Sequence, residues 1–261
     1  MSRRAPVSPE WVAACRELLT IVSRADDRWP VDKELAIAQT LKYAEEIQHL
    51  HGEERRQRQA AEEALARVED SYGATVRALG AALHMRDDQT GAHAERVTEL
   101  GLALARAVAP RLVKDPHLEY GFLLHDIGKI GIPDRILLKP GRLTPAERDE
   151  MQYHPVLGER IVAKVPYLNG VARDVVAAHH ERWDGTGYPR RLAGSRIPLA
   201  ARIFAVIDAY DAMTMERPYR EVIPPDAAVG EIIFGAGTQF DPEVAEAFAE
   251  VAPTLAWAAA A

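Results

Sequence analysis

The segment LEYGFLLHDIGK, residues 118–129, is an apolar helical sequence that ends with two side chains of metal-ligand type, a histidine and an aspartate. Leu118 and Phe122 precede His125 by seven and three residues, so a helix places all three on one face. Asp126 follows at once, and a glycine two residues later is expected to close the turn. The segment therefore predicts a buried helix that carries an imidazole and a carboxylate at its end.

Other segments pair a ligand-type side chain with an apolar helical stripe. His93 lies four, seven and eleven residues before three apolar residues, and His154 lies three residues after a methionine and seven before an isoleucine. His179 and His180 follow two valines, and Asp208 follows an isoleucine. The pattern thus predicts that the following side chains face inward: His93, His125, Asp126, His154, His179, His180 and Asp208.

Each of these side chains, taken alone, has a structural explanation. A buried histidine is more often a hydrogen-bonded core residue than a ligand, and Asp126 or Asp208 alone can cap a helix. Together, several inward imidazoles and two carboxylates without matching partners would carry a large desolvation cost. Metal ions would remove that cost, since neutral imidazole suits Fe, Mn, Ni or Zn. Two ions about 3.5–4 Å apart can activate a water for in-line phosphoryl displacement.

The rest of the chain predicts an all-α protein in two parts. No segment shows sustained strand-like alternation. Thr144-Pro145-Ala146-Glu147 combines an N-cap, a proline at the first helical position and a capping-box glutamate, and Asp241-Pro242-Glu243 repeats this signal. After about residue 72, glycine and proline punctuate apolar helical segments at the density of a globular domain. We therefore expect an N-terminal helical segment over 1–72 and the main domain over 73–255.

The N-terminal segment from Glu34 to Asp70 is highly charged and helix-forming. An apolar stripe on alternating three- and four-residue steps is interrupted by Glu54 and Gln57. Two interpretations stay open, a solvated helix that leads into the main domain and a coiled-coil helix that forms a homodimer. Apolar residues within 11–21 indicate a further short helix packed on it. The stripe consists of Tyr43, Ile47, Leu50, Ala61, Ala64 and Val68.

Composition excludes several function classes. The 261 residues are 48% apolar and 27% charged, as in an ordinary globular protein, and the net charge of −7 argues against DNA or RNA binding. Cys15 is the one cysteine, and no stretch reaches the roughly 18 apolar residues of a membrane span, so we expect a cytoplasmic protein without membrane contact. From Arg182 to Arg220, however, the sequence holds seven arginines and four acidic residues, so this segment is net positive. This local basic patch suits an anionic substrate.

Four motifs, taken together in their order along the chain, are far more specific than any one of them alone. They are HDIGK at 125–129, HHERWDGTGYP at 179–189, DAYDAM at 208–213 and RPYR at 217–220. In this order the chain resembles HD-GYP domains, the cyclic-di-GMP phosphodiesterase branch of the HD superfamily. The resemblance extends from about Arg86 to Phe248. It implies an HD-domain helical bundle and a metal-dependent phosphodiesterase that hydrolyses cyclic-di-GMP.

The resemblance also implies a metal site with two divalent ions, Fe or Mn being favoured. The basic HD set is matched by His93, His125, Asp126 and Asp208, with Asp126 as the bridge. The additional HD-GYP ligands are matched by His154, His179 and His180. Some HD-GYP domains hold a third ion through a glutamate four residues before the first histidine, where this chain has Gln89. We therefore expect two ions, with linear pGpG as the favoured product and further cleavage to GMP left open.

The substrate-handling residues are implied in the same way. Asp126 and Lys129 are the expected catalytic residues: ions bridged by the aspartate lower the pKa of a water, and the lysine holds the scissile phosphate. Lys129 alone can also complement a helix C-terminus. Tyr188 either stacks on a guanine or packs within a rigid turn, and its Gly187-Tyr188-Pro189 loop rests beside the substrate or docks a GGDEF-type partner protein. The matches to phosphate-contacting positions are Arg217 and Arg220.

Two rival functions remain open from the sequence. The chain can be a weakly active or inactive module that binds cyclic-di-GMP or docks a protein, with Gln89 as a sign of drift in the site. It can also be an HD phosphohydrolase that acts on another nucleotide. The complete set of two-metal ligand types speaks against the first rival, and the Gly187-Tyr188-Pro189 motif speaks against the second.

Overall fold

The computed structural model divides the chain into two compact units, residues 1–70 and 71–261. Its described residues are 33–86, 92–215 and 222–255, with the single positions 13, 17 and 20. Several sequence predictions lie outside the described residues, namely the short helix over 11–21 and the roles of Gln89, Arg217 and Arg220. Among the described residues, none of the helices combines the length and apolar composition that crossing a bilayer requires.

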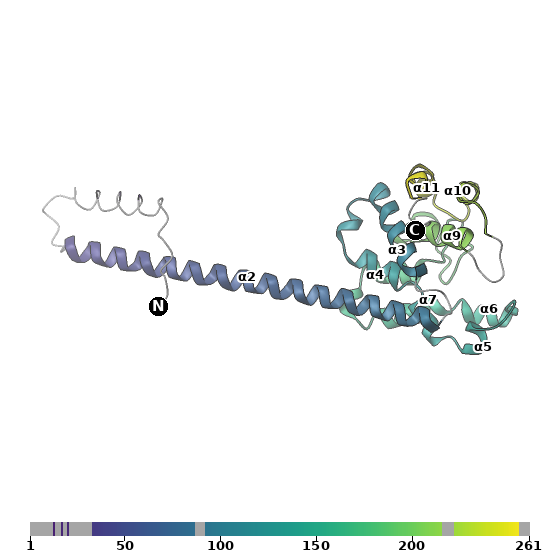
Figure 1. The fold of residues 1–261 in the computed structure, drawn as a ribbon, viewed down its shortest axis with the longest axis horizontal. Helices are drawn as coiled ribbons and strands as arrows, with labels where there is room; N and C mark the ends of the chain where they lie inside the picture. Colours follow the sequence, from purple (N-terminus) through teal and green to yellow (C-terminus); the bar gives the residue numbers. More distant parts are fainter. Residues whose placement is uncertain are drawn as a thin grey trace. The chain divides into compact units, whose positions relative to one another are not determined.

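Helices make up the regular structure of the described residues, apart from one isolated β-bridge between Ala236 and Phe240 (Figure 1). The all-α prediction is confirmed. The α-helices are α2 (Lys33–Arg86), α3 (Ala92–Val108), α4 (His117–Leu123), α5 (Asp134–Leu137), α6 (Pro145–Met151), α7 (His154–Val162), α8 (Val171–Ala178), α9 (Leu199–Thr214), α10 (Pro225–Phe234) and α11 (Pro242–Leu255). The 3-10 helices are η1 (Leu112–Lys114), η2 (Ile127–Gly131), η3 (Pro166–Leu168) and η4 (Gly194–Arg196).

Helix α2 contains the whole segment from Glu34 to Asp70 that the sequence predicts as a helix. It continues to Arg86, so the predicted boundary at residue 72 falls inside one helix. Much of the apolar stripe is exposed, with Leu50 at 63% and Val68 at 52%. Pairing of this stripe with a second copy stays a prediction.

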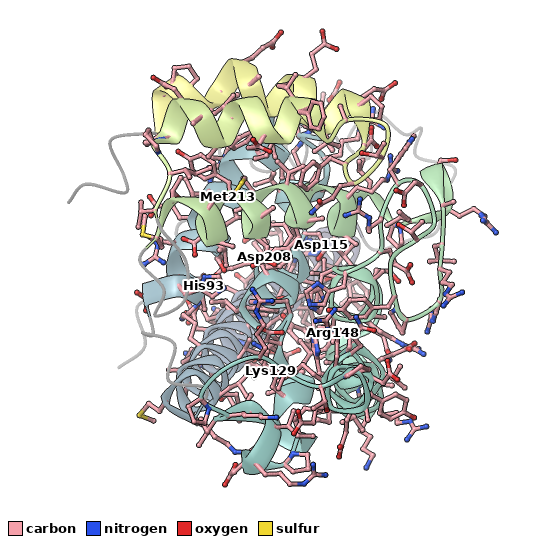
Figure 2. The ribbon with its side chains drawn as sticks, turned by 90° about the vertical axis from the view of Figure 1, so that its right-hand side faces the viewer. His93, Asp115, Lys129, Arg148, Asp208 and Met213 are labelled. Carbon is pink, nitrogen blue, oxygen red and sulfur yellow. The ribbon has the colours of Figure 1, made fainter. Side chains whose placement is uncertain are left out.

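The main core of the unit 71–261 is formed by α3, α4, α8, α9, α10 and α11. Apolar α9 lies within it and contacts α3 and α8 as well as α10 and α11. Figure 2 shows α10 and α11 on the side of α9 away from Lys129. Phe122 of α4 and Phe204 of α9 are fully buried, with ring centroids 5.1 Å apart. The segment 118–129 is therefore anchored on α9 by aromatic packing.

Both helix starts predicted from caps are confirmed. The Thr144 hydroxyl accepts a hydrogen bond from the Glu147 N–H at 3.3 Å, and the Glu147 carboxylate accepts one from the Thr144 N–H at 2.8 Å. This reciprocal pair opens α6. At α11 the Asp241 carboxylate accepts a hydrogen bond from the Glu243 N–H at 2.9 Å.

Gly128 lies where η2 crosses the start of α7. A Cβ atom at this position would lie 1.8 Å from the carbonyl oxygen of His154 and 2.5 Å from the amide nitrogen of Gly158. Only a residue without a side chain allows the two backbones to approach this closely. The crossing holds Asp126, two residues before Gly128, beside His154.

We expect Gly128→Ala to lower the free energy of unfolding by about 1–3 kcal/mol or more, because the methyl group meets backbone that cannot move aside. The matched control is Gly230→Ala in α10, where a Cβ would meet nothing within 4 Å. It should gain about 0.5–1 kcal/mol from helix propensity. Denaturant unfolding of both variants measures the difference, and equal stabilities would contradict the crossing described here.

Candidate metal centre

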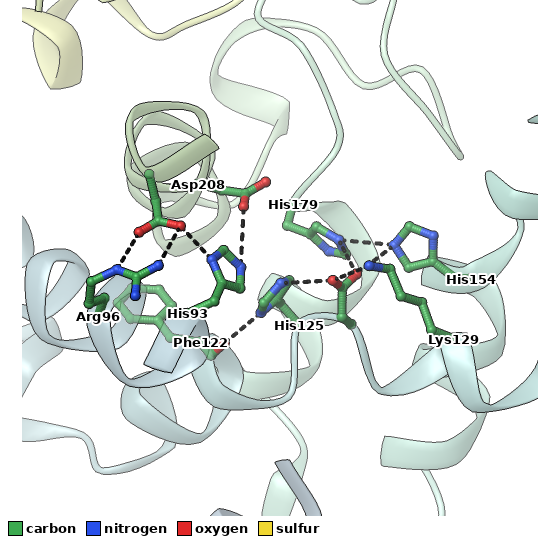
Figure 3. A network of polar contacts seen from close by, with 10 residues as sticks. His93, Arg96, Phe122, His125, Lys129, His154, His179 and Asp208 are labelled. Carbon is green, nitrogen blue, oxygen red and sulfur yellow. Dashed lines mark hydrogen bonds and ion pairs between the residues drawn. The ribbon is translucent and has the colours of Figure 1, made fainter. Parts of the chain in front are cut away.

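Two clusters of ligand-type side chains lie next to each other in the unit 71–261 (Figure 3). Within each cluster, one nitrogen or carboxylate oxygen per residue lies within 4.8 Å of those of the other members. The first cluster consists of Asp126, His154, His179 and His180, and the second of His93, His125 and Asp208. The structure thus brings together all seven side chains that the sequence predicts as metal ligands.

Different elements deliver these side chains. His93 lies in the first turn of α3, His125 follows α4, and His154 is the first residue of α7. His179 follows α8, and Asp208 lies in the middle of α9. The helices converge because α3, α4 and α8 bury apolar residues in two core clusters, one shared with α9 and the other with α7, so their ends or inner faces meet at one place.

Three of the imidazoles are oriented by the same local contact. His125, His154 and His179 each place Nδ1 beside the main-chain carbonyl oxygen three residues earlier, at 2.8, 2.9 and 3.1 Å. A carbonyl oxygen only accepts, so each Nδ1 carries the proton and donates it. Each Nε2 then presents its lone pair to the cluster, which is the tautomer that a metal ligand needs.

His93 is oriented by a carboxylate instead. Its Nδ1 lies 2.5 Å from Asp211 Oδ2, while its Nε2 lies 3.8 Å from Asp208 Oδ1. Arg96 donates to both Asp211 oxygens, at 2.8 and 3.2 Å. Burial opposes ionisation of Asp211, but the hydrogen bonds from His93 and Arg96 hold the pKa of its carboxyl below the usual value.

The sequence reasoning assigned no role to Asp211 or Arg96. A signal for Asp211 was present, since a residue three positions after Asp208 on a helix lies on the same face. Arg96, by contrast, carries no local signal, because its partner is 115 residues away along the chain.

The first cluster is electrostatically incomplete without a cation. His154 Nε2 lies 3.1 Å from Asp126 Oδ1 and 3.2 Å from His179 Nε2. Because both Nδ1 atoms carry the proton, each of these contacts places two lone pairs against each other. No hydrogen bond from the described residues reaches the buried Oδ1. A divalent ion bound among these atoms would satisfy all three, and imidazole with carboxylate suits Fe, Mn or Zn. The residues present therefore fit a metal ion.

The two oxygens of Asp126 face different neighbours. Oδ1 faces His154 and, at 3.8 Å, His179, while Oδ2 lies 3.1 Å from His125 Nε2. The Lys129 ammonium lies 2.8 Å from Oδ2. One carboxylate thus reaches both clusters, which is the arrangement expected of a bridging ligand.

Protonation states near neutral pH favour metal binding. Burial, with smaller contributions from His179 and His154, holds the pKa of His180 well below its usual value, and burial likewise lowers the pKa of His179. Burial opposes ionisation of Asp126, yet Lys129 and His125 hold the pKa of that carboxyl well below its usual range. His179 and His180 are therefore offered as neutral imidazoles and Asp126 as an ionised carboxylate.

Tyr188 lies at the edge of the first cluster. Its ring centroid is 4.7 Å from that of His180, and burial raises the pKa of its phenol, which keeps the hydroxyl protonated. The loop that carries it folds back on residues 180–182. The approach is so close that a Cβ at Gly187 would lie 2.4 Å from the Arg182 amide nitrogen. Docking of a GGDEF-type protein on this loop stays a prediction.

Glu181 fixes the loop that carries Tyr188 through hydrogen bonds to its main chain, a role that the sequence did not predict. Its side chain is buried and accepts hydrogen bonds from the main-chain N–H groups of Arg190 and Leu192, at 2.7 and 2.9 Å. Its position directly after His179-His180 was the available signal, since a carboxylate there needs partners once the helix is buried.

The HD domain family profile matches residues 77–244. This chain belongs to the HD domain family. A cyclic di-GMP phosphodiesterase of Thermotoga maritima is 42% identical over 190 residues, which are 72% of this chain and 51% of the relative. A 3'3'-cGAMP-specific phosphodiesterase of Vibrio cholerae is 38% identical over 177 residues, which are 67% of this chain and 38% of the relative. The chain therefore spans about half or less of the length of these relatives.

The fold agrees with the same family. The solved structure of a cyclic GMP-AMP-specific phosphodiesterase of Vibrio cholerae has a TM-score of 0.51 at 20% sequence identity, over 70% of this chain and 49% of that chain. The match supports the fold alone. The HD-GYP resemblance and the HD-domain helical bundle predicted from the motifs are confirmed.

We expect Asp211→Asn to weaken divalent metal binding by about 10–100-fold, because an amide no longer fixes the tautomer of His93. Asp149→Asn, an exposed change on α6, is the control and should leave affinity unchanged. Calorimetric titration with Mn²⁺ measures both, with circular dichroism to verify the fold. Equal affinities for the two variants would show that His93 does not depend on Asp211.

Proposed function

We propose that residues 73–255 form a metal-dependent phosphodiesterase that hydrolyses cyclic-di-GMP to linear pGpG. The observation that carries the proposal is the Asp126 carboxylate, which faces a cluster of ligands on either side and pairs with the Lys129 ammonium at 2.8 Å. Buried imidazoles, a shared carboxylate and an adjacent cation are suited to phosphate ester hydrolysis rather than to structural metal binding alone.

The proposed ligands are the seven residues of the two clusters, for two ions with Fe or Mn favoured. When bound, such ions would supply an activated water and positive charge for the phosphate. Lys129 would hold a phosphate oxygen and protonate the leaving 3′ oxygen, because its ammonium lies 2.8 Å from the Asp126 carboxylate. The ring of Tyr188, beside His180, would contact the substrate, and Arg217 and Arg220 would bind its phosphates.

The choice of substrate rests on the relatives. The names of the relatives divide between cyclic di-GMP and 3'3'-cGAMP, both of them cyclic dinucleotides with two phosphodiester groups. The basic segment from Arg182 to Arg220 suits this doubly anionic class. A panel of cyclic-di-GMP, 3'3'-cGAMP and other nucleotides tests the preference, and we expect the highest kcat/KM for cyclic-di-GMP.

We expect the double variant His125→Ala with Asp126→Ala to lose bound metal and to lose turnover by about 1,000-fold or more, because both clusters lose a ligand. Helical content should be retained. The matched control replaces an exposed pair, His49→Ala with Asp149→Ala, and should keep both properties. Metal analysis, a hydrolysis assay and circular dichroism are the measurements; hydrolysis that survives the double change would refute the site.

A second expectation concerns the number of ions. Replacement of Gln89 by glutamate should raise the metal content from two ions to three per chain, since a carboxylate is a far better ligand than an amide. The same variant should shift the product from pGpG towards GMP. Metal analysis of anaerobically purified protein with product chromatography measures both, and an unchanged stoichiometry would refute the two-ion proposal.

We also propose that the helix from Glu34 to Asp70 pairs two copies of the chain, because its stripe is exposed at Ile47, Leu50 and Val68. Light scattering of the intact chain should give the mass of a dimer. The variant Leu50→Glu with Val68→Glu should give a monomer, since it buries like charges in a coiled-coil seam. A monomeric mass for the unaltered chain would contradict the proposal.

A further inference from the structure

Arg86, the last residue of α2, binds the segment that carries Lys129. Its Nη1 donates to the carbonyl oxygens of Lys129 and Ile130, at 3.2 and 2.6 Å. Its Nη2 donates to the carbonyl oxygen of Ile132 at 2.9 Å and to the carboxylate of Asp134 at 2.8 Å. A single guanidinium thus bonds the end of η2 and the residues that follow it.

The sequence after η2 explains why the Ile130 carbonyl needs an outside donor. In a 3-10 helix the carbonyl of Ile130 would accept from residue 133, but residue 133 is proline and has no N–H group. Arg86 supplies the missing donor at 2.6 Å. The Lys129 carbonyl also accepts a hydrogen bond from the Ile132 N–H at 3.0 Å, so the guanidinium is its second donor, whereas for Ile130 it replaces the N–H group that proline lacks.

The turns of α2 that precede Arg86 pack against the residues on either side of His125-Asp126. Val76 and Leu83 are buried with Leu123 and Leu124, which directly precede His125, and with Ile127. Between them, a Cβ at position 80 would lie in ordinary contact with the Leu123 carbonyl oxygen, at 3.4 Å, so the helix lies directly against this residue. Residues 71–86 of α2 therefore contact the chain both before and after His125-Asp126.

We propose that Arg86 is a positioning residue that makes the placement of Lys129 depend on the last turn of α2. Lys129 is one of the three residues whose carbonyls the guanidinium binds, and its ammonium lies 2.8 Å from Asp126. An axial shift of α2 by one residue is about 1.5 Å, enough to break all four hydrogen bonds. A movement of the last turn of α2 would thereby reach the phosphate-binding lysine.

The activity arm of the test rests on the proposed function. In the metal-loaded full chain, Arg86→Gln should lower kcat for cyclic-di-GMP by about 10–100-fold through misplacement of Lys129. Arg86→Lys, which keeps a donor, should recover part of that loss. Arg77→Gln is the matched control, because Arg77 lies on the same helix and its guanidinium donates at the surface to the half-buried Glu119 carboxylate, at 3.3 Å. It should stay within about twofold of the unaltered chain.

A double-mutant cycle separates positioning from general damage. If Arg86 acts through the lysine, Arg86→Gln should cost less than about threefold once Lys129→Met has removed the ammonium. The same loss in both backgrounds would overturn the proposal. Metal content equal to that of the unaltered chain is required of each variant, so that a loss of ions is not counted as misplacement.

A second arm does not depend on activity. Amide hydrogen exchange of residues 127–132 should speed up about tenfold or more in Arg86→Gln, while exchange in α9 stays unchanged. Unchanged exchange in residues 127–132 would overturn the proposal. If the unaltered chain hydrolyses no cyclic dinucleotide, the proposed function fails and this exchange measurement alone decides the role of Arg86.

Discussion

The structure of the unit 71–261 depends on burying an ionised carboxylate, Asp126, among imidazoles. Such a group is costly inside a protein unless charge and hydrogen bonds compensate it. Lys129 compensates one oxygen at 2.8 Å, whereas the other is left to lone pairs of His154 and His179. The fold thus leaves one oxygen of a buried carboxylate without a compensating positive charge. That deficit is the physical reason to place a metal ion there.

The scaffold serves to keep this arrangement rigid. Three imidazoles are fixed by carbonyls within their own turn, so their orientation is secured as soon as each helix end forms. The second cluster instead depends on a partner far away in the chain, since His93 is held by Asp211. The crossing at Gly128 and the hydrogen bonds from Arg86 fix η2, the 3-10 helix that directly follows Asp126.

Much of the site could be predicted because its ligands repeat the period of the helices that carry them. His93, His125 and His154 share faces with apolar residues at helical spacing, so burial of the helix brings the ligand inward. The supporting contacts of Arg96 and Arg86 had no such signal, because they join residues 115 and 43–48 positions apart. Gly128 was expected to close a turn, yet it is required by the approach of a second backbone. Close approaches between distant segments are set by tertiary packing, which one sequence does not display.

Anomalous diffraction from crystals of the Mn²⁺-loaded chain tests the central claim most directly, because it locates ions independently of activity. The account predicts two peaks about 3.5–4 Å apart on either side of the Asp126 carboxylate. One ion should contact His154, His179 and His180, and the other His93, His125 and Asp208. A single peak elsewhere, or none within reach of Asp126, would contradict it.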